Sequence, residues 1–224
     1  GRCIVNSINL EDGGANLRRI VPLVRKYGAA VVALTINRNG MAMTVEDKLA
    51  TARDIHRMAV EEGGLRPQDL FFDALTFTIG SGDETLRDAA ARTLTAIGRI
   101  KTELPGVFTA LGLSNVSFGL PPAARRMLNS VFLHEAVEAG MDGAIVDAGR
   151  ILPLARVPEE TRELCLDLVY DRVREAGKTP LMTLIAHFQQ TAETEGDKGK
   201  ERAFELPEAT LFRKVVEGDK EELG

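Results

Sequence analysis

Asparagine and aspartate recur where the apolar segments of this chain end. Asn6, Asn37, Asp73, Asn115 and Asp147 each lie at, or just after, the end of an apolar run. A carboxylate accepts two neighbouring N–H groups at once, whereas a carboxamide both donates and accepts. Together they suit a rigid, flat heterocycle whose edge alternates donors and acceptors. A single such residue is more simply explained as a helix cap or turn residue, but polar groups at all five ends favour a binding site.

The same positions contain no nucleophile with a base beside it. His56, His134 and His187 all fall in segments with helical periodicity, where a packing or surface role is the ordinary explanation. Residues 80–83 (GSGD) lack the lysine and the spacing of a phosphate loop. We expect Ser81 or Asp83 to cap the helix that follows. Covalent catalysis by a side chain is therefore not expected.

The elements that must position these groups alternate between strands and helices. Short apolar, β-branched runs predict strands at Cys3–Val5, Ala30–Leu34, Leu70–Phe72, Val107–Leu111 and Gly143–Val146. Apolar residues spaced three and four apart predict helices at Asn16–Tyr27, Val45–Glu62, Glu84–Ile100 and Pro121–Ala139. Strand followed by helix, repeated, indicates right-handed βαβ units and a parallel sheet, with functional groups at the strand ends.

The spacing of the strands favours part of a larger barrel. The strand starts lie about 35 residues apart, so that eight units would need roughly 280 residues, a normal size for a (β/α)₈ barrel. Only five units are present, and the chain begins inside a strand. We therefore expect a partial TIM barrel that comprises its last five βα units, with the N-terminal strands absent. A complete five-stranded open sheet is the alternative.

The C-terminal part differs in composition from the rest. Two further helices are predicted at Pro158–Glu175 and Pro180–Thr191. We expect the barrel to occupy residues 1–192 and a polar linker to occupy residues 193–206. Residues 207–224 predict one amphipathic helix that is too short to fold alone, and so the start of a further domain.

Composition excludes several functional classes. A net charge of −5 argues against a nucleic-acid surface, and no apolar run is long enough to cross a membrane. No leader segment is recognisable, so that a cytoplasmic location is expected. Cys3 and Cys165 lie far apart without metal-ligand spacing. We predict no metal site, and we expect both thiols to be buried as small hydrophobes.

Several long motifs resemble the folate domain of the cobalamin-dependent methionine synthase family. They are residues 3–12 (CIVNSINLED), 75–83 (LTFTIGSGD), 112–126 (GLSNVSFGLPPAARR), 128–136 (LNSVFLHEA) and 151–154 (ILPL). The third of these is highly specific, and the resemblance covers residues 1–190. Residues 211–218 (LFRKVVEG) look like the start of the helical cap that precedes the cobalamin-binding domain in that family.

The resemblance implies a fold and an activity. It implies a pterin-binding barrel, related to that of dihydropteroate synthase, that binds 5-methyltetrahydrofolate. The N5 methyl group would pass to cob(I)alamin carried by a neighbouring domain, and then to homocysteine held by a zinc-dependent module outside this chain. A non-catalytic pterin-binding fragment and a methyltransferase acting on a corrinoid iron–sulfur protein are the alternatives. No nucleic acid and no membrane is expected as a partner.

The resemblance also implies roles for four residues. Asn6, Asp73 and Asn115 match pterin-binding positions of the family, and Arg125 is a weaker match to an arginine near the ligand in corrinoid protein methyltransferases. Asn115 is the candidate for catalytic help beside the transferring methyl group. The chain departs from the family at Ala74, where proline is usual. Residues 114–116 (SNV) lack the Ser-Arg-Lys-type run expected of dihydropteroate synthase, and a further acidic ligand would lie on an earlier strand outside the chain.

Overall fold

A computed structural model of the protein describes the backbone of residues 1–200 and the side chains of residues 1–190. Its main element is a five-stranded sheet in which every neighbouring pair is parallel. The strands, in their order across the sheet, are β1 (Ile4–Ile8), β2 (Ala30–Leu34), β5 (Leu70–Asp73), β6 (Phe108–Gly112) and β7 (Gly143–Ile145). All five lie where the apolar runs predict them.

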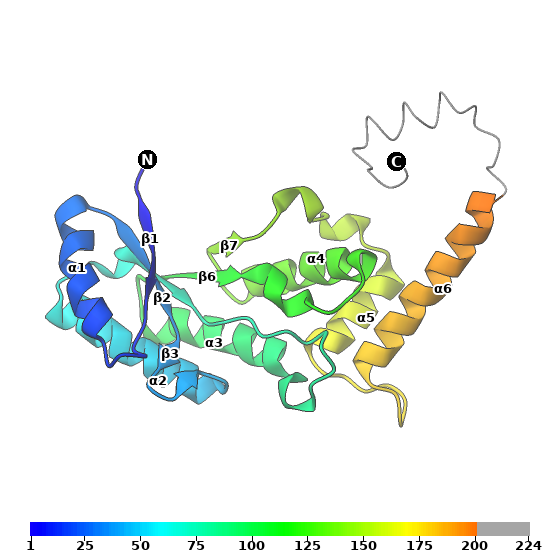
Figure 1. The fold of residues 1–224 in the computed structure, drawn as a ribbon, viewed down its shortest axis with the longest axis horizontal. Helices are drawn as coiled ribbons and strands as arrows, with labels where there is room; N and C mark the ends of the chain where they lie inside the picture. Colours follow the sequence, from blue (N-terminus) through cyan, green and yellow to red (C-terminus); the bar gives the residue numbers. More distant parts are fainter. Residues whose placement is uncertain (201–224) are drawn as a thin grey trace, which may run out of the picture. The chain divides into compact units, whose positions relative to one another are not determined.

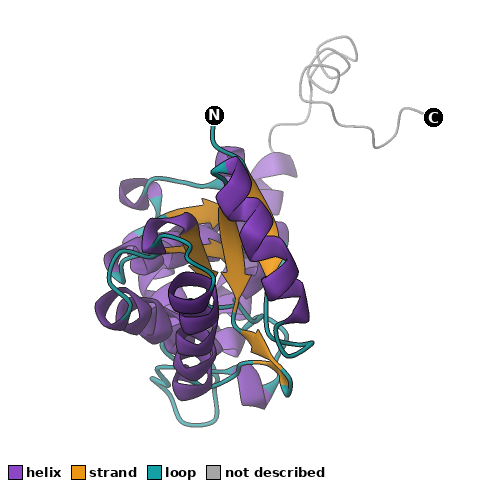
Figure 2. Ribbon diagram, turned by 90° about the vertical axis from the view of Figure 1, so that its left-hand side faces the viewer, coloured by secondary structure: helices purple, strands orange, loops and turns teal. Residues whose placement is uncertain are grey.

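The strand order follows the sequence without a reversal. A doubly wound open sheet reverses its order at a switch point, whereas a barrel adds each strand beside the last one. Right-handed crossovers then bring every connecting helix to the same face of a curled sheet. Figures 1 and 2 show the strands side by side with the helices along them. The fold is therefore five βα units of a TIM-type barrel, as predicted.

The helices between the strands agree with the predicted periodicity, with local changes of helix type. They are α1 (Ala15–Tyr27), α2 (Val45–His56), α3 (Ala89–Glu103) and α4 (Pro122–Glu138). The segment predicted as one helix at 45–62 continues beyond α2 as a π-helix, η1 (Arg57–Glu62). The one predicted at 84–100 begins as a 3₁₀ turn, η3 (Glu84–Leu86), before α3. The Asp83 side chain caps η3 by accepting from the backbone N–H of Thr85, at 2.9 Å.

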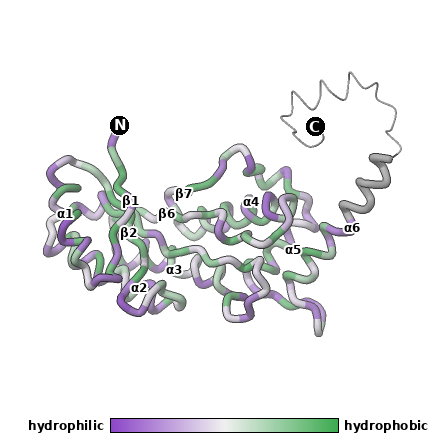
Figure 3. Tube along the Cα trace, in the orientation of Figure 1, coloured by the Kyte–Doolittle hydropathy of each residue, from purple (hydrophilic) through white to green (hydrophobic). Residues whose placement is uncertain are grey.

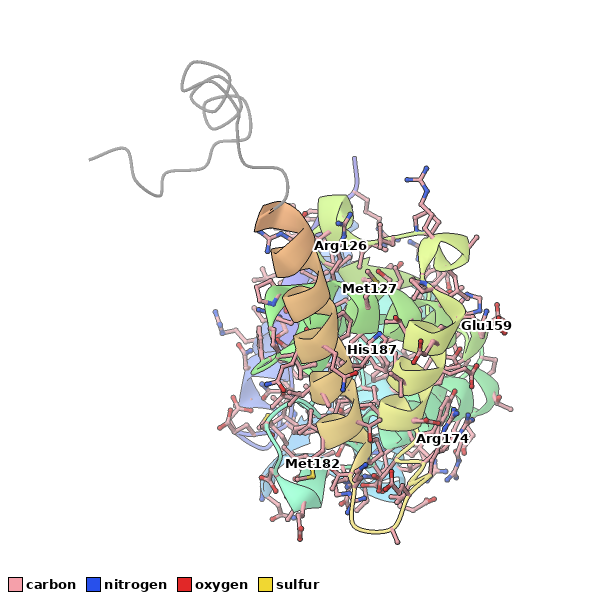
Figure 4. All side chains as sticks on the ribbon, turned by 90° about the vertical axis from the view of Figure 1, so that its right-hand side faces the viewer. Arg126, Met127, Glu159, Arg174, Met182 and His187 are labelled. Atoms are coloured by element: carbon pink, nitrogen blue, oxygen red, sulfur yellow. The ribbon has the colours of Figure 1, made fainter. Side chains whose placement is uncertain are left out.

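The helix predicted at 158–175 is shorter than expected. The structure forms α5 (Glu159–Val169), and the chain leaves the helical path at Asp171, where φ is +50°. The carboxylate of Asp171 pairs with the distant Arg87, 2.9 Å away. In Figure 4, Glu159 and Arg174 mark the start of α5 and the segment after it.

A few short elements have no counterpart in the predicted pattern. Residues after β2 form a small antiparallel hairpin of β3 (Ile36–Asn37) and β4 (Gly40–Met41). Four 3₁₀ helices connect other elements: η2 (Pro67–Asp69), η4 (Leu113–Ser117), η5 (Ala148–Arg150) and η6 (Leu154–Arg156). Of these, η4 matters most for function because it directly follows β6.

The core lies between the sheet and its helices. The largest buried apolar side chains include Ile8, Leu17, Leu49, Ile55, Leu70, Phe72, Ile97, Ile100, Leu111, Leu113 and Phe132. Figure 3 shows hydrophobic residues concentrated along β1 and β2. Cys165 is buried as predicted, but the prediction for Cys3 is wrong: Cys3 is exposed. It precedes β1, which lies at the edge of the described sheet and pairs with β2.

The chain divides into two units, residues 1–185 and 186–224. The helix predicted at 180–191 is α6 (Pro180–Lys200), so residues 193–200 of the expected linker are helical. The rest of that linker and the amphipathic helix predicted at 207–224 lie outside the described residues, and the domain boundaries stay predictions. None of the helices described is long and apolar enough to span a membrane.

Candidate functional site at the carboxyl ends of β5 and β6

Asp73 ends β5, and its backbone and side chain are both held in place. Its carbonyl accepts from the backbone N–H of Thr35, at 3.1 Å, and from the Thr35 hydroxyl, at 3.2 Å. Its carboxylate Oδ1 accepts from the backbone N–H of Leu75, at 2.8 Å. Such a bond from an aspartate to its own backbone two residues on is a common way to close a turn. The carboxylate is therefore oriented before any ligand binds.

Burial raises the pKa of the Asp73 carboxyl group above its ordinary value. The backbone N–H groups of Leu75 and Gly112 and the charge of Lys48 oppose this rise. The side chain forms none of the ion pairs found among the described residues, although it is half-buried. A half-buried carboxylate without a cation in direct contact retains acceptor capacity for a ligand.

Asn115 lies in η4, immediately beyond the end of the neighbouring strand β6. Its side chain is exposed. A Cβ atom added at Gly112 would lie 3.2 Å from the Asn115 amide nitrogen, so this glycine leaves room for the carboxamide. The Gly112 N–H also lowers the pKa of the Asp73 carboxyl group, so one residue at the end of β6 acts on both polar side chains.

Hydrogen bonds join the loops that carry these two residues. The backbone N–H of Ile79 donates to the carbonyl of Val116, at 3.1 Å, and the Thr78 hydroxyl donates to the carbonyl of Phe118, at 2.7 Å. In the same loop the Thr76 hydroxyl is buried and has no hydrogen-bond partner among the described residues. An unpaired buried hydroxyl is costly, and this one lies three residues after Asp73.

Arg125 supports η4 from the first turns of α4. Its Nε donates to the Ser117 hydroxyl, at 3.2 Å, and its guanidinium lies 5.0 Å from the centre of the Phe118 ring. Arg125 also lines a cavity of about 280 Å³ together with Asp147 and Arg150. The structure thus places Arg125 beside the turn that carries Asn115.

The structure does not bring all the predicted polar groups together. Asn6 is exposed on the edge strand β1, and β2 separates it from β5. Asn37 is used locally, since its amide donates to the Thr51 hydroxyl at 3.0 Å. Asp147 caps η5 and pairs with Arg150, at 3.2 Å. Asp73 and Asn115 therefore form the centre of the candidate site, with Asn6 at a distance across the sheet.

Two residues that sequence reasoning missed hold the loop after β5. Lys48 in α2 donates to the carbonyls of Ala74 and, at 3.3 Å, Leu75. Thr93 in α3 donates to the carbonyl of Leu75, at 2.9 Å. One signal was present in the sequence: Lys48 precedes the buried residues Ala52 and Ile55 by four and seven positions, so it occupies the apolar face of its helix.

This geometry fits recognition of a flat heterocycle better than covalent chemistry. A carboxylate and a carboxamide lie at neighbouring strand ends. Among the described residues, no three His, Cys, Asp or Glu side chains gather in a group that could hold a metal ion. The arrangement can accept two N–H groups at Asp73 and exchange hydrogen bonds in either direction at Asn115.

Comparison with known proteins agrees with this geometry. Residues 1–147 match the family model described as pterin binding enzyme. The chain is 45% identical over 227 aligned residues to a methionine synthase of Mycobacterium leprae (strain TN), and 44% identical to one of Mycobacterium tuberculosis (strain ATCC 25618 / H37Rv). Each alignment covers 98% of this chain but only 19% of the relative, so the chain spans about a fifth of their length. The chain belongs to the family of pterin-binding enzymes.

Proposed function

We propose that this chain is the folate-binding part of a methyltransferase of the methionine synthase type. It binds 5-methyltetrahydrofolate and presents the N5 methyl group for transfer to cob(I)alamin, which a neighbouring domain holds. Homocysteine and its zinc site belong to another module outside the chain. The family match supports pterin binding, and the names of the two mycobacterial relatives support the reaction.

The observation that carries the proposal is the oriented, half-buried carboxylate of Asp73. A pterin presents a 2-amino group and N3–H side by side, and one carboxylate can accept from both in a charge-assisted, two-point contact. Asn6 and Asn115 supply groups for the mixed donors and acceptors on the rest of the ring. Arg125 contributes by supporting the turn of Asn115. The distance between Asn6 and β5 means that a ligand would have to extend across the sheet to reach both.

Methyl transfer requires help at N5. When the methyl–N5 bond breaks, the bonding electron pair stays on N5, and an amine nitrogen leaves well only if it gains a proton or a strong hydrogen bond. The exposed carboxamide of Asn115 can accept from a protonated N5 through its oxygen, or donate to a neutral N5 through its nitrogen. A placed donor of this kind typically contributes about 2.7–4 kcal/mol to transition-state stabilisation.

The cofactor is assigned no ligand in this chain. When bound, cob(I)alamin would supply the nucleophile that accepts the methyl group. The work of the described residues is to bind the pterin, orient its N5 and stabilise the proton or hydrogen bond there. A methyltransferase acting on a corrinoid iron–sulfur protein would need the same site, but the relatives are named methionine synthases.

The test uses the full-length protein that contains this chain. Binding of 5-methyltetrahydrofolate is measured by calorimetry, and methyl transfer to free cob(I)alamin is followed by its absorbance. Binding with transfer is expected. Binding without transfer would support the non-catalytic alternative, and no binding would overturn the proposal. Asp73→Asn, which removes the carboxylate, should weaken this binding. Its matched control is Asp69→Asn, because Asp69 directly precedes the strand that Asp73 ends.

A further inference from the structure

Lys48 occupies a position that neither helix stability nor core packing explains. Its side chain is fully buried, with 0% exposure. It is also close to the N-terminus of α2, where Glu46 and Asp47 complement the helix dipole but a cation opposes it. Burying a charged side chain is costly unless it finds partners. The partners of Lys48 therefore account for its presence.

The hydrogen bonds and the ring contact of the Lys48 ammonium all involve one short segment, the loop after β5. Nζ donates to the carbonyls of Ala74 and Leu75 and lies 4.8 Å from the centre of the Phe77 ring. The charge of Asp73 acts on it from the end of the strand. Lys48 thus pairs with two successive carbonyls of this loop and with the ring of Phe77 from the buried side of the loop.

The loop adopts a conformation that needs such support. Leu75 has φ of +62°, a left-handed conformation that costs a non-glycine residue about 1–2 kcal/mol. This turn places the Leu75 N–H 2.8 Å from Asp73 Oδ1 and so orients the carboxylate. The Leu75 carbonyl, on the other side of the same turn, accepts from both Lys48 and Thr93. These two side chains come from the adjacent helices α2 and α3 (Figure 1).

We propose that Lys48 is a positioning residue of the pterin site: its buried ammonium holds the turn at Ala74 and Leu75 that aims the Asp73 carboxylate at the ligand. This inference rests on the function proposed above and adds a residue outside the strand ends to it. Lys48 does not touch the ligand, because its ammonium is sealed beneath the loop.

The electrostatics of the pair are consistent with this role. Burial lowers the pKa of Lys48 to about 8, and the charge of Asp73 opposes that shift. Burial likewise raises the pKa of Asp73, and the charge of Lys48 opposes it. Arg92 in α3 also faces Lys48 and lowers its pKa further, while Arg92 itself pairs with Asp88 at 2.5 Å. Removing the ammonium would therefore raise the pKa of Asp73 further.

The decisive variant is Lys48→Met, which retains most of the stem and removes the charge. In the full-length protein we expect 5-methyltetrahydrofolate to bind about tenfold more weakly near pH 7, because the charged hydrogen bonds that hold the turn beneath Asp73 are lost. The deficit should shrink as the pH rises past about 8, because the pKa of Lys48 lies there and the unsubstituted protein then loses the same charge. The rate of methyl transfer at saturating folate should change much less than the affinity. Lys48→Arg should restore part of the affinity.

Lys101→Met is the matched control. Lys101 also donates to a backbone carbonyl, that of Val107 at 3.0 Å, lies 5.5 Å from the centre of the Phe108 ring and pairs with Asp142. It does so at the opposite ends of the strands, so its loss should leave folate affinity and its pH profile unchanged. A general effect of removing a lysine would appear in both variants.

A second variant keeps the inference testable if Lys48→Met does not fold. Thr93→Val removes the other hydrogen bond to the Leu75 carbonyl without changing any charge. It should weaken folate binding by a few-fold at every pH, without the recovery at high pH, because a neutral hydrogen bond contributes roughly 1 kcal/mol.

Calorimetry across pH then separates the outcomes. Wild-type affinity in Lys48→Met, or a deficit that is equal at every pH, would overturn the role of Lys48 while leaving the proposed function intact. If Lys48→Met does not fold, wild-type affinity in Thr93→Val would overturn it. No folate binding by the unsubstituted protein would overturn both the proposed function and this inference.

Discussion

Strand β5 has an aspartate at each end, and the two carboxylates differ in whether they are paired with arginines. Asp69 directly precedes the strand and Asp73 ends it. Asp69 accepts from Arg66 Nε and Nη2, each at 3.0 Å, and from Arg2. Asp73 has no arginine or lysine in direct contact among the described residues. One end of the strand thus carries a carboxylate that is fully paired with arginines, and the other end carries a carboxylate that can still accept hydrogen bonds.

The pKa values of the two carboxyl groups shift in opposite directions. Burial alone would raise the pKa of Asp69, but the hydrogen bonds and charges of Arg66 and Arg2 outweigh burial and lower it. At Asp73 burial prevails and the pKa is raised. In barrels of this type the amino ends of strands serve stability and the carboxyl ends serve function. The difference teaches that burying the ionised Asp73 carboxylate costs the fold stability, and that hydrogen bonds from a ligand can offset this cost.

The largest expected effect is on the rate of methyl transfer and concerns only the carboxyl ends of the strands. Asn115→Ala should slow methyl transfer to cob(I)alamin by about 10²–10³-fold, the usual cost of removing one placed donor, because the carboxamide at N5 is lost. Folate affinity should fall much less, as measured by calorimetry beside single-turnover kinetics. Equal losses in affinity and rate would mean that Asn115 contributes binding only.

The second prediction compares the two aspartates in binding. Asp73→Asn should weaken binding of 5-methyltetrahydrofolate by roughly 10- to 100-fold, since hydrogen bonds to a charged group contribute about 1.5–3 kcal/mol. Asp69→Asn, at the other end of β5, should bind as the unsubstituted protein does. Calorimetry decides the matter, and a similar loss in both variants would remove the functional distinction between the strand ends.

The third prediction compares the same two variants in stability, where Asp69 should matter more than Asp73. Asp69→Asn should lower the free energy of unfolding by about 1–3 kcal/mol, because it leaves two partly exposed arginines without their partner. Asp73→Asn should not lower it, because the native state already disfavours the charged form. Urea denaturation of the two variants measures both values. A larger loss of stability for Asp73→Asn would contradict the assignment of roles.

Acidification should change the contributions of the two aspartates to stability in opposite directions. The native state depresses the pKa of Asp69, so its stabilising contribution is present above the unfolded value of 3.8 and is lost as the pH falls below it. The deficit of Asp69→Asn should therefore shrink on acidification through that range. The raised pKa of Asp73 has the opposite sign: its penalty disappears as the pH falls through the raised value toward 3.8.

The smallest expected effect concerns Gly112. A Cβ atom at this position would press on the Asn115 amide nitrogen, at 3.2 Å. Gly112→Ala should reduce the rate of methyl transfer by several-fold, because small misplacements of a positioned group lower rates measurably. Stability should be almost unchanged, because φ at Gly112 is −73°, which alanine also adopts. An unaltered rate would show that Asn115 has room to move without loss.

Much of the frame could be predicted because it depends on local patterns. Apolar runs and helical spacing predict every strand of the sheet and the helices between them, and the polar residues at the strand ends follow from the same pattern. The errors lie where distant partners intervene. Asp171, just beyond the end of α5, pairs with the distant Arg87, and Cys3 is exposed where it precedes an edge strand.

The sequence by itself determined the parallel βα order, and it proposed Asp73 and Asn115 at the carboxyl ends of the strands as candidates for the site. Only the tertiary structure decided which strand ends meet, how Arg125 supports the turn of Asn115, and that Lys48 lies beneath the loop after β5. The physical reason is range. Periodicity and propensity act between residues close in the chain, whereas the charge of a buried lysine acts on a carboxylate 25 residues away that only folding brings near.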